Sequence, residues 1–267
     1  MNTATGTPAR RPGFWTSSFV LAWRSLHNFF SNPALIVPAL LFPLFFFTAF
    51  AGGLSGVADV PGFDYPNGYT AFQFGFVLLQ ASAFGGVFTG FGIARDFESG
   101  FSRRIMLATP HRSAILVGYA MSSLVRAMVV GTMLFVIALA VGMNFSGGPL
   151  DVLGLIGLAL MMNLLALLFA SGIAFRLRTI QAGPLMQTPI FMVIFLTPVY
   201  VPQHLLHGWI KSVSDYNPIT AVIEASRSLI AGIPEEVVLA FGLGAALATV
   251  LLTWSLTGLR NAERAGG

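Results

Sequence analysis

A short polar stretch interrupts an otherwise apolar chain and holds the residues best suited to chemistry. It reads FESGFSRRIMLATPHRSAIL, residues 97–116, and brings Glu98, Arg103, Arg104 and His111 close together in sequence. Carboxylate and guanidinium groups can pair with each other or bind a charged partner. Neither a Ser-His-Asp arrangement nor a pair of intramembrane carboxylates accompanies them. The sequence therefore predicts a binding role, with no catalytic residue and no enzyme activity of its own.

Two other patterns could in principle bind a metal or a nucleotide. His204 and His207 are spaced to share a metal on one helix, but the sequence offers no third ligand nearby, so we expect no metal site. A P-loop needs Gly-Lys-Ser/Thr, because the lysine reaches the phosphates. The only lysine, Lys211, follows Ile210. The chain is therefore expected to bind no cofactor and to hydrolyse no ATP.

The elements that position these residues are apolar helices. Of 267 residues, 55% are hydrophobic and 9% are charged, whereas a soluble domain carries about 25% charged residues. Roughly 20 apolar residues in a helix cross a hydrocarbon core of about 30 Å. We predict an all-α, polytopic membrane protein with six transmembrane helices. The predicted spans are residues 34–54, 69–93, 114–141, 152–175, 184–202 and 236–259.

The distribution of charge predicts the orientation in the membrane. With a cytoplasmic N-terminus, all but two of the 14 basic residues, Lys211 and Arg227, fall on the cytoplasmic side. Of the ten acidic residues, only Asp96, Glu98 and Glu263 fall there. Because an excess of basic residues in short loops marks the cytoplasmic side, we expect a multi-pass protein of a bacterial cell membrane with both termini inside. Topology explains the positive charge without a nucleic-acid partner.

Residues 1–33 are predicted to form a cytoplasmic tail and an amphipathic elbow helix. In that helix Trp15 and Trp23 lie on the apolar side and Arg24 on the polar side, a pattern typical of helices that lie in the membrane interface and contact lipid. Residues 34–260 would form the six-span transmembrane domain.

A second cytoplasmic tail is expected at residues 261–267. The segment 199–232, between the fifth and sixth spans, is too polar to cross the membrane. It is predicted to form two short helices that meet at Asn217-Pro218, and Glu224 can pair with Arg227 on the second. Two interpretations remain open: half-helices that re-enter the outer leaflet, or helices that lie on the outer surface.

Few polar residues are predicted within the spans. The amides of Gln80 and Asn163 need a partner in hydrocarbon, which is either another helix or a substrate. Helix packing is the usual reason, and a substrate path is the alternative. Arg126, in the third span, is expected to extend its side chain toward the cytoplasmic interface.

The loop at residues 95–112 is predicted to contain a short helix from about Phe97 to Leu107. Its charged residues would point outward and its apolar ones inward, and Gly100 is expected to allow another backbone to approach. An apolar and basic projection of this kind can fit a groove on a soluble protein. The outward residues would be Glu98, Arg103 and Arg104, and the inward ones Phe101, Ile105 and Met106.

This loop resembles that of ABC type-2 exporter permeases, particularly the daunorubicin-resistance kind. The matching residues of the loop are Asp96, Glu98, Gly100, Arg104, Pro110, Arg112, Leu116 and Gly118. A second landmark of the family is similar to YNPITAVIEASRSLIAG, through Asn217, Pro218, Thr220, Glu224, Arg227, Leu229 and Gly232. The chain departs from the family in having Phe101, Ser102 and Arg103 where many members have threonine and an acid.

The resemblance implies a permease without its own motor. Two permease chains, identical or paired with a sister subunit, would bind two copies of a separate ATPase that holds ATP and magnesium. The residues implied in ATPase coupling are Asp96, Glu98, Gly100, Phe101, Arg103 and Arg104. Those implied in an outer gate, within the segment 199–232, are Asn217, Pro218, Glu224 and Arg227.

The implied cargo is a hydrophobic or amphiphilic compound of the drug or antibiotic type. Two alternatives stay open: an exporter of a cell-envelope lipid or glycan precursor, and an ATP-independent channel or scaffold.

Overall fold

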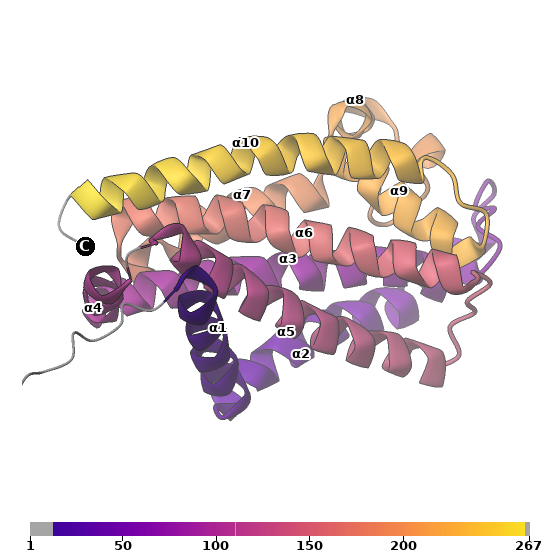
Figure 1. Cartoon of the computed structure of the whole chain (residues 1–267). Helices are drawn as coiled ribbons and strands as arrows, with labels where there is room; N and C mark the ends of the chain where they lie inside the picture. The colour runs from indigo at the N-terminus through magenta and orange to yellow at the C-terminus, as the bar shows by residue number, and fades with distance from the viewer. Residues whose placement is uncertain (1–12, 110, 265–267) are drawn as a thin grey trace, which may run out of the picture.

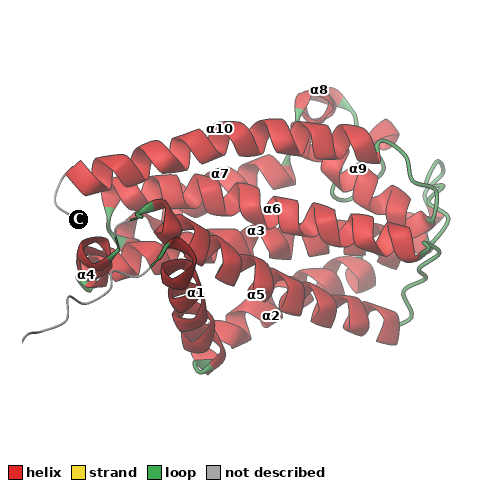
Figure 2. Ribbon diagram, in the orientation of Figure 1, coloured by secondary structure: helices red, strands yellow, loops and turns green. Residues whose placement is uncertain are grey.

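The computed structural model describes residues 13–109 and 111–264. Within these residues the chain forms helices joined by loops and contains no strand (Figure 2), which confirms the all-α prediction for this part of the chain. The motif residue Pro110 lies outside the described residues, as do residues 1–12 and 265–267 of the two predicted tails.

The helices run mostly lengthwise in one bundle, with α1 crossing it steeply (Figure 1). In chain order they are α1 (Phe14–Phe30), α2 (Pro33–Gly53), α3 (Gly68–Glu98), α4 (Phe101–Ala108), α5 (Ser113–Ala140), α6 (Pro149–Leu177), α7 (Gly183–Phe195), α8 (Gly208–Tyr216), α9 (Pro218–Ala231) and α10 (Val237–Arg264). Short 3₁₀ turns are η1 (Ser55–Asp59), η2 (Ile180–Ala182) and η3 (Gln203–Leu205). Within the described residues, five helices are long and apolar enough to cross a membrane: α2, α3, α5, α6 and α10.

The predicted fifth span, residues 184–202, is helical only as far as Phe195. Its helix, α7, has 13 residues, so at about 1.5 Å per residue it is about 20 Å long, shorter than a hydrocarbon core. The prediction of a helix up to residue 202 is wrong, because Pro198 disfavours helical backbone at Thr197. Residues 196–202 form irregular backbone instead.

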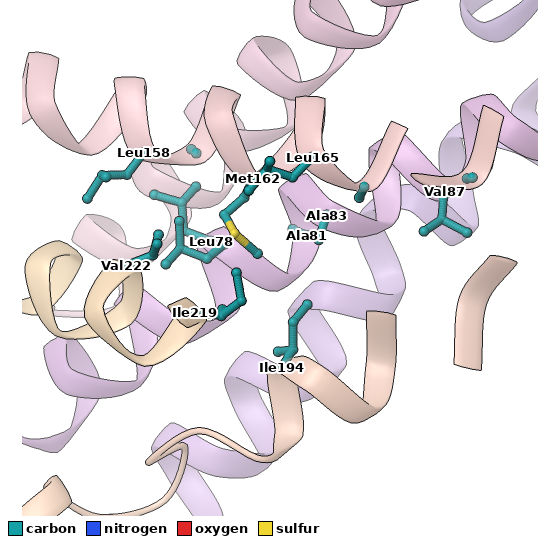
Figure 3. Close-up of a cluster of buried hydrophobic side chains, with 14 of the residues drawn as sticks. Leu78, Ala81, Ala83, Val87, Leu158, Met162, Leu165, Ile194, Ile219 and Val222 are labelled. Atoms are coloured by element: carbon teal, nitrogen blue, oxygen red, sulfur yellow. The ribbon is translucent and has the colours of Figure 1, made fainter. Parts of the chain in front are cut away.

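The bundle is organised around α3, which packs against α2, α5, α6, α7 and α9. Its closest neighbour is α6, because glycines on α3 remove the side chains that would separate the two backbones. A Cβ on Gly86 would lie 2.3 Å from the Asn163 carbonyl oxygen and 2.6 Å from the Leu167 nitrogen. Side chains from α3, α6, α7 and α9 fill the adjoining core; they include Leu78, Ala83, Met162, Leu165, Ile194, Ile219 and Val222 (Figure 3).

The elbow helix α1 packs against α5. Ser18 donates a hydrogen bond to the Ala114 carbonyl at 3.0 Å, and Gly118 allows α1 to approach, since a Cβ there would lie 2.8 Å from the Ser18 carbonyl oxygen. Trp15 and Trp23 point away from the bundle and are 63% and 72% exposed. The side of α1 that carries Ser18, Leu21 and Ala22 therefore faces protein, and the side that carries Trp15 and Trp23 is free to face lipid.

The segment between α7 and α10 does form two short helices that meet at Asn217-Pro218, as predicted. α8 is peripheral, whereas α9 is buried against α3, α6 and α10. The two helices therefore differ in packing, and the choice between re-entrant helices and helices on the outer surface of the membrane stays open.

Candidate functional site

The charged loop between α3 and α5 folds around a sharp bend at Gly100. α3 continues to Glu98, Gly100 adopts the left-handed conformation at φ +71°, and α4 begins only at Phe101. The predicted start of the helix near Phe97 is therefore wrong, because a left-handed residue cannot continue a right-handed helix. Within the described residues no atom lies within 4 Å of a Cβ placed on Gly100, so inside this chain the glycine serves the bend. Approach of another backbone to Gly100 stays a prediction.

Asp96, 9% exposed, holds the end of α3 to two other helices. Arg24 of α1 donates two hydrogen bonds of 2.9 Å to its carboxylate, and Tyr119 of α5 donates one of 2.5 Å. The hydrogen bond to Asp96 raises the pKa of the Arg24 guanidinium above its ordinary value. That guanidinium also lies over the ring of Phe101 on α4, 3.6 Å from the centroid. We call Arg24, Asp96, Phe101 and Tyr119 the Asp96 cluster.

Glu98 ties the same end of α3 to the loop that precedes α7. Its Oε1 accepts hydrogen bonds from the Thr179 hydroxyl at 2.7 Å and from the Ile180 backbone N–H at 2.9 Å. The prediction that Glu98 points freely outward is therefore incomplete, because its carboxylate is already engaged. Arg112, after α4, lies 3.9 Å from Glu263 near the end of α10.

The free face of α4 consists of basic and apolar side chains. Arg103 and Arg104 are exposed, and Leu107 is 82% exposed. On the opposite face Ser102 and Met106 are buried. The six predicted coupling residues thus divide: Arg103 and Arg104 point outward, Gly100 forms the bend, and the other three hold α4 in place. α4 lies at the same end of the bundle as the C-terminal end of α10 (Figure 1).

The predicted gate residues lie toward the opposite end of the bundle. Asn217 caps α9 by accepting a hydrogen bond from the Ile219 backbone N–H at 3.0 Å, and its amide donates to the Val193 carbonyl on α7 at 2.7 Å. Pro218 is the first residue of α9, where a missing N–H costs nothing. These two residues therefore fix the start of α9 against the end of α7.

Arg227 is the most unusual of the gate residues because its charged side chain is only 2% exposed. It pairs with Glu224 at 2.8 Å, as predicted, and its guanidinium lies 3.4 Å from the centroid of Phe72 on α3. It also donates to the Val199 carbonyl at 3.3 Å, and Gln73 donates to the same oxygen at 3.0 Å. These donors satisfy irregular backbone after α7, as buried backbone requires. We call these five residues the Arg227 cluster.

Tyr65, in the loop before α3, holds this cluster from the other side. Its hydroxyl donates a hydrogen bond to the Arg227 carbonyl at 2.8 Å. Burial raises the pKa of the Tyr65 hydroxyl, so this donor keeps its proton across the physiological range.

The two candidate substrate-path residues have different surroundings. Asn163 on α6 accepts a hydrogen bond from Ser123 and donates one to the Ser82 carbonyl, both at 2.8 Å, so its amide joins α3, α5 and α6. Gln80 is 1% exposed, and neither of its amide atoms has a hydrogen-bond partner within the described residues. The packing interpretation fits Asn163, whereas Gln80 retains polar atoms that are free to bind another molecule.

Comparison with known proteins identifies the family of this chain and the residues that the match covers. A family model described as "ABC-2 type transporter" matches residues 16–231. The chain belongs to this family. The daunorubicin resistance ABC transporter permease protein DrrB1 of Streptomyces coeruleorubidus is 24% identical over 215 residues, which cover 79% of this chain and 73% of that protein. The match to the ABC-2 family includes α4, α9 and every residue of both clusters.

In this ABC-2 transporter the charged residues of both clusters hold helices together. Within the described residues, no group of three His, Cys, Asp or Glu side chains could hold a metal ion. His204 instead lies 2.8 Å from the Gly62 carbonyl oxygen. The clusters connect helices through charge-assisted hydrogen bonds, which resist separation.

Several residues of the clusters, and others that contact the predicted site residues, were not predicted as site residues. Arg24 was assigned only to the polar side of α1, although a lone arginine in a helix near a membrane interface indicates a nearby carboxylate. Tyr119 and Tyr65 gave no signal, because tyrosines are common where a helix packs. Gln73 did carry one, because an amide within a predicted span needs a partner in hydrocarbon. Thr179 also gave none, since its partner lies in a different loop.

Proposed function

We propose that this ABC-2 transporter is the permease subunit of an ATP-driven exporter, and that α4 is its contact with a separate ATPase that binds ATP and magnesium. The observation that carries the proposal is the division of the coupling residues. Arg103, Arg104 and Leu107 form a free basic and apolar face, while Asp96 and Glu98 anchor the base of α4. A helix that transmits the movement of a partner protein needs both an exposed face for contact and a base that is fixed to the membrane helices.

Movement of α4 would reach the membrane helices through its anchors. The Asp96 cluster connects α4 to α1, α3 and α5. Glu98 connects α3 to the loop before α7 through Thr179 and Ile180. Closure of a pair of ATPases would therefore displace several helices together as one packed unit.

The proposed membrane arrangement has six crossings with both termini in the cytoplasm. α2, α3, α5, α6 and α10 provide five crossings, and α7 with residues 196–202 provides the sixth. α8 and α9 form the re-entrant outer gate at residues 199–232. Residues 1–33 form the tail and interfacial elbow, residues 34–260 the transmembrane domain, and residues 261–267 the second tail. Burial of α9 supports the re-entrant interpretation, since a surface helix would keep one face exposed.

The assembly we propose contains two permease chains, identical or from a sister subunit, and two ATPases. The cargo is a hydrophobic or amphiphilic compound of the drug type, as the name of the Streptomyces relative suggests for that protein. Gln80 is the residue we assign to the cargo path, because its buried amide lacks a partner within the described chain and an unpaired amide in hydrocarbon is costly.

The decisive experiment is to purify the chain from its native membrane in mild detergent and identify what accompanies it. We expect a stoichiometric ATPase with a Gly-Lys-Ser/Thr sequence. Replacing Arg103 and Arg104 by glutamate should reduce its recovery roughly tenfold, because like charges would then face a surface shaped for basic residues. Arg260→Glu, an exposed arginine near the end of α10, is the matched control and should not reduce recovery.

Recovery of the ATPase with both variants alike would show that α4 is not the contact. Purification of the wild-type chain without any ATPase, after controls for loss in detergent, would favour the ATP-independent channel or scaffold.

A further inference from the structure

A cavity of about 200 Å³ lies beside the Asp96 cluster, between α1, the start of α2, α3 and α5. At roughly 10–15 Å³ for each water, it can hold a hydrated polar headgroup. Its lining combines apolar side chains with polar and basic ones. The charged residues that line it are Arg24, Arg95, Asp96 and Arg126.

The charge of this cavity is not balanced within the described residues. Arg24 and Asp96 neutralise each other through their paired hydrogen bonds. Arg126 donates to the Thr89 hydroxyl at 2.5 Å and to the Ser122 carbonyl at 3.3 Å, both neutral acceptors. Neither Arg126 nor Arg95 has a carboxylate within 4.0 Å among the residues that the structure describes. The charge of Arg126 therefore has no counterion in the described part of the chain, which is costly for a charged group inside a helix bundle. Arg95 is exposed and interacts with the charge of Glu98, so it adds a weaker positive charge to the mouth of the cavity.

A narrow apolar groove continues from the cavity between α2 and α3. The two spaces share Phe29, Pro38, Phe88 and Arg126 in their linings. Beyond these residues the groove is lined by alanine, phenylalanine and proline side chains, including Ala39. Its volume of about 30 Å³ is too small for a ring system and admits only a few methylene groups at the start of a linear alkyl chain. The cavity beside Arg126 is thus continuous with an apolar groove.

We propose that this site holds one anionic phospholipid of the cytoplasmic leaflet, with its phosphate at Arg126 and Arg95 and an acyl chain along the groove. The phosphate would supply the missing counterion through charge-assisted hydrogen bonds. The depth fits: α1, which forms one wall, carries Trp15 and Trp23 on its exposed side, as helices at the headgroup level do. The proposal rests on the cytoplasmic orientation of the N-terminus and is independent of the ATPase contact.

The test is native mass spectrometry of the full chain after reconstitution in nanodiscs of phosphatidylglycerol and phosphatidylcholine in equal amounts. We expect one phosphatidylglycerol to stay bound through transfer to detergent. Arg126→Gln should lower its occupancy about tenfold, the loss expected for a buried hydrogen bond to a charged group. The matched control, Arg260→Gln, removes an exposed arginine outside the cavity and should bind as the wild type does.

A second pair of variants tests the groove without altering charge. Ala39→Trp would fill the groove and should also lower phosphatidylglycerol occupancy. Leu41→Trp replaces a side chain of α2 that is 59% exposed and should leave the occupancy unchanged. Equal retention of phosphatidylcholine, or full retention by both Arg126→Gln and Ala39→Trp, would overturn the proposal. If chain from native membranes carries a different anionic amphiphile at this site, the site belongs to cargo and the lipid assignment is wrong.

Discussion

The ion pair of the Arg227 cluster is asymmetric, and the asymmetry predicts unequal costs for losing either partner. The side chain of Arg227 is 2% exposed and that of Glu224 is 31% exposed. Glu224→Gln would leave a buried guanidinium without its carboxylate, which typically costs about 3–5 kcal/mol. Arg227→Met would leave a carboxylate that water can reach, and the Val199 carbonyl would keep its hydrogen bond from Gln73. We expect that change to cost about 1–2 kcal/mol, because the hydrogen bonds it removes from backbone carbonyls are long, at 3.3 Å.

The assay is unfolding in mixed micelles titrated with SDS, followed by tryptophan fluorescence. The double variant Glu224→Gln, Arg227→Met removes the buried charge together with its partner, so it should cost about as much as Arg227→Met alone. Lys211→Met is the control, because Lys211 pairs with Asp215 at 3.6 Å with both side chains well exposed, and surface pairs contribute at most about 1 kcal/mol.

Two results would refute the reasoning. One is a cost for Arg227→Met that equals or exceeds the cost for Glu224→Gln. The other is additive costs in the double variant, since additivity would mean that the two side chains do not interact.

Three further predictions concern the helix contacts and the topology. Gly86→Ala should destabilise the fold by about 1–3 kcal/mol, because its Cβ would meet α6 backbone at 2.3 Å. The control is Gly92→Ala on the same helix, which has open space for a Cβ and should not destabilise the fold. Equal unfolding midpoints for the two variants would contradict the packing argument. Gly100→Ala should cost about 1–2 kcal/mol through its left-handed φ alone, and Gly100→Asn should cost less; thermal unfolding of both variants checks the order. Tyr216→Cys, at a site 89% exposed in a chain with no native cysteine, should react with an impermeant thiol reagent added outside cells, and labelling only in opened cells would reverse the proposed orientation.

The long apolar helices could be predicted from sequence because their signal is an average over some 20 residues. A few boundary errors do not disturb such an average, so five predicted spans coincide with α2, α3, α5, α6 and α10. The Glu224–Arg227 pair could be predicted for a different reason: both residues lie on one helix at a spacing that brings them together.

The remaining errors arise where a single residue or a distant contact decides the local structure. One proline ended α7 early, and one left-handed glycine separated α4 from α3. The hydrogen bonds between Asp96 and Arg24 were not predicted either, because Arg24 lies 72 positions earlier in the chain. The surroundings of Gln80 and Asn163 likewise depend on which helices meet, and a single sequence does not contain that information.

One helix, α3, connects the Asp96 cluster with the Arg227 cluster. α3 has 31 residues and is therefore about 46 Å long. Near its first turn, Phe72 and Gln73 contact Arg227 and the Val199 carbonyl; at its last turn, Asp96 and Glu98 hold α4 and the loop before α7. A close-packed helix moves as a rigid element because its interfaces resist gradual deformation. If α9 is the outer gate as proposed, a displacement of α4 would reach it through the backbone of α3 itself, with no relay of intervening side chains required.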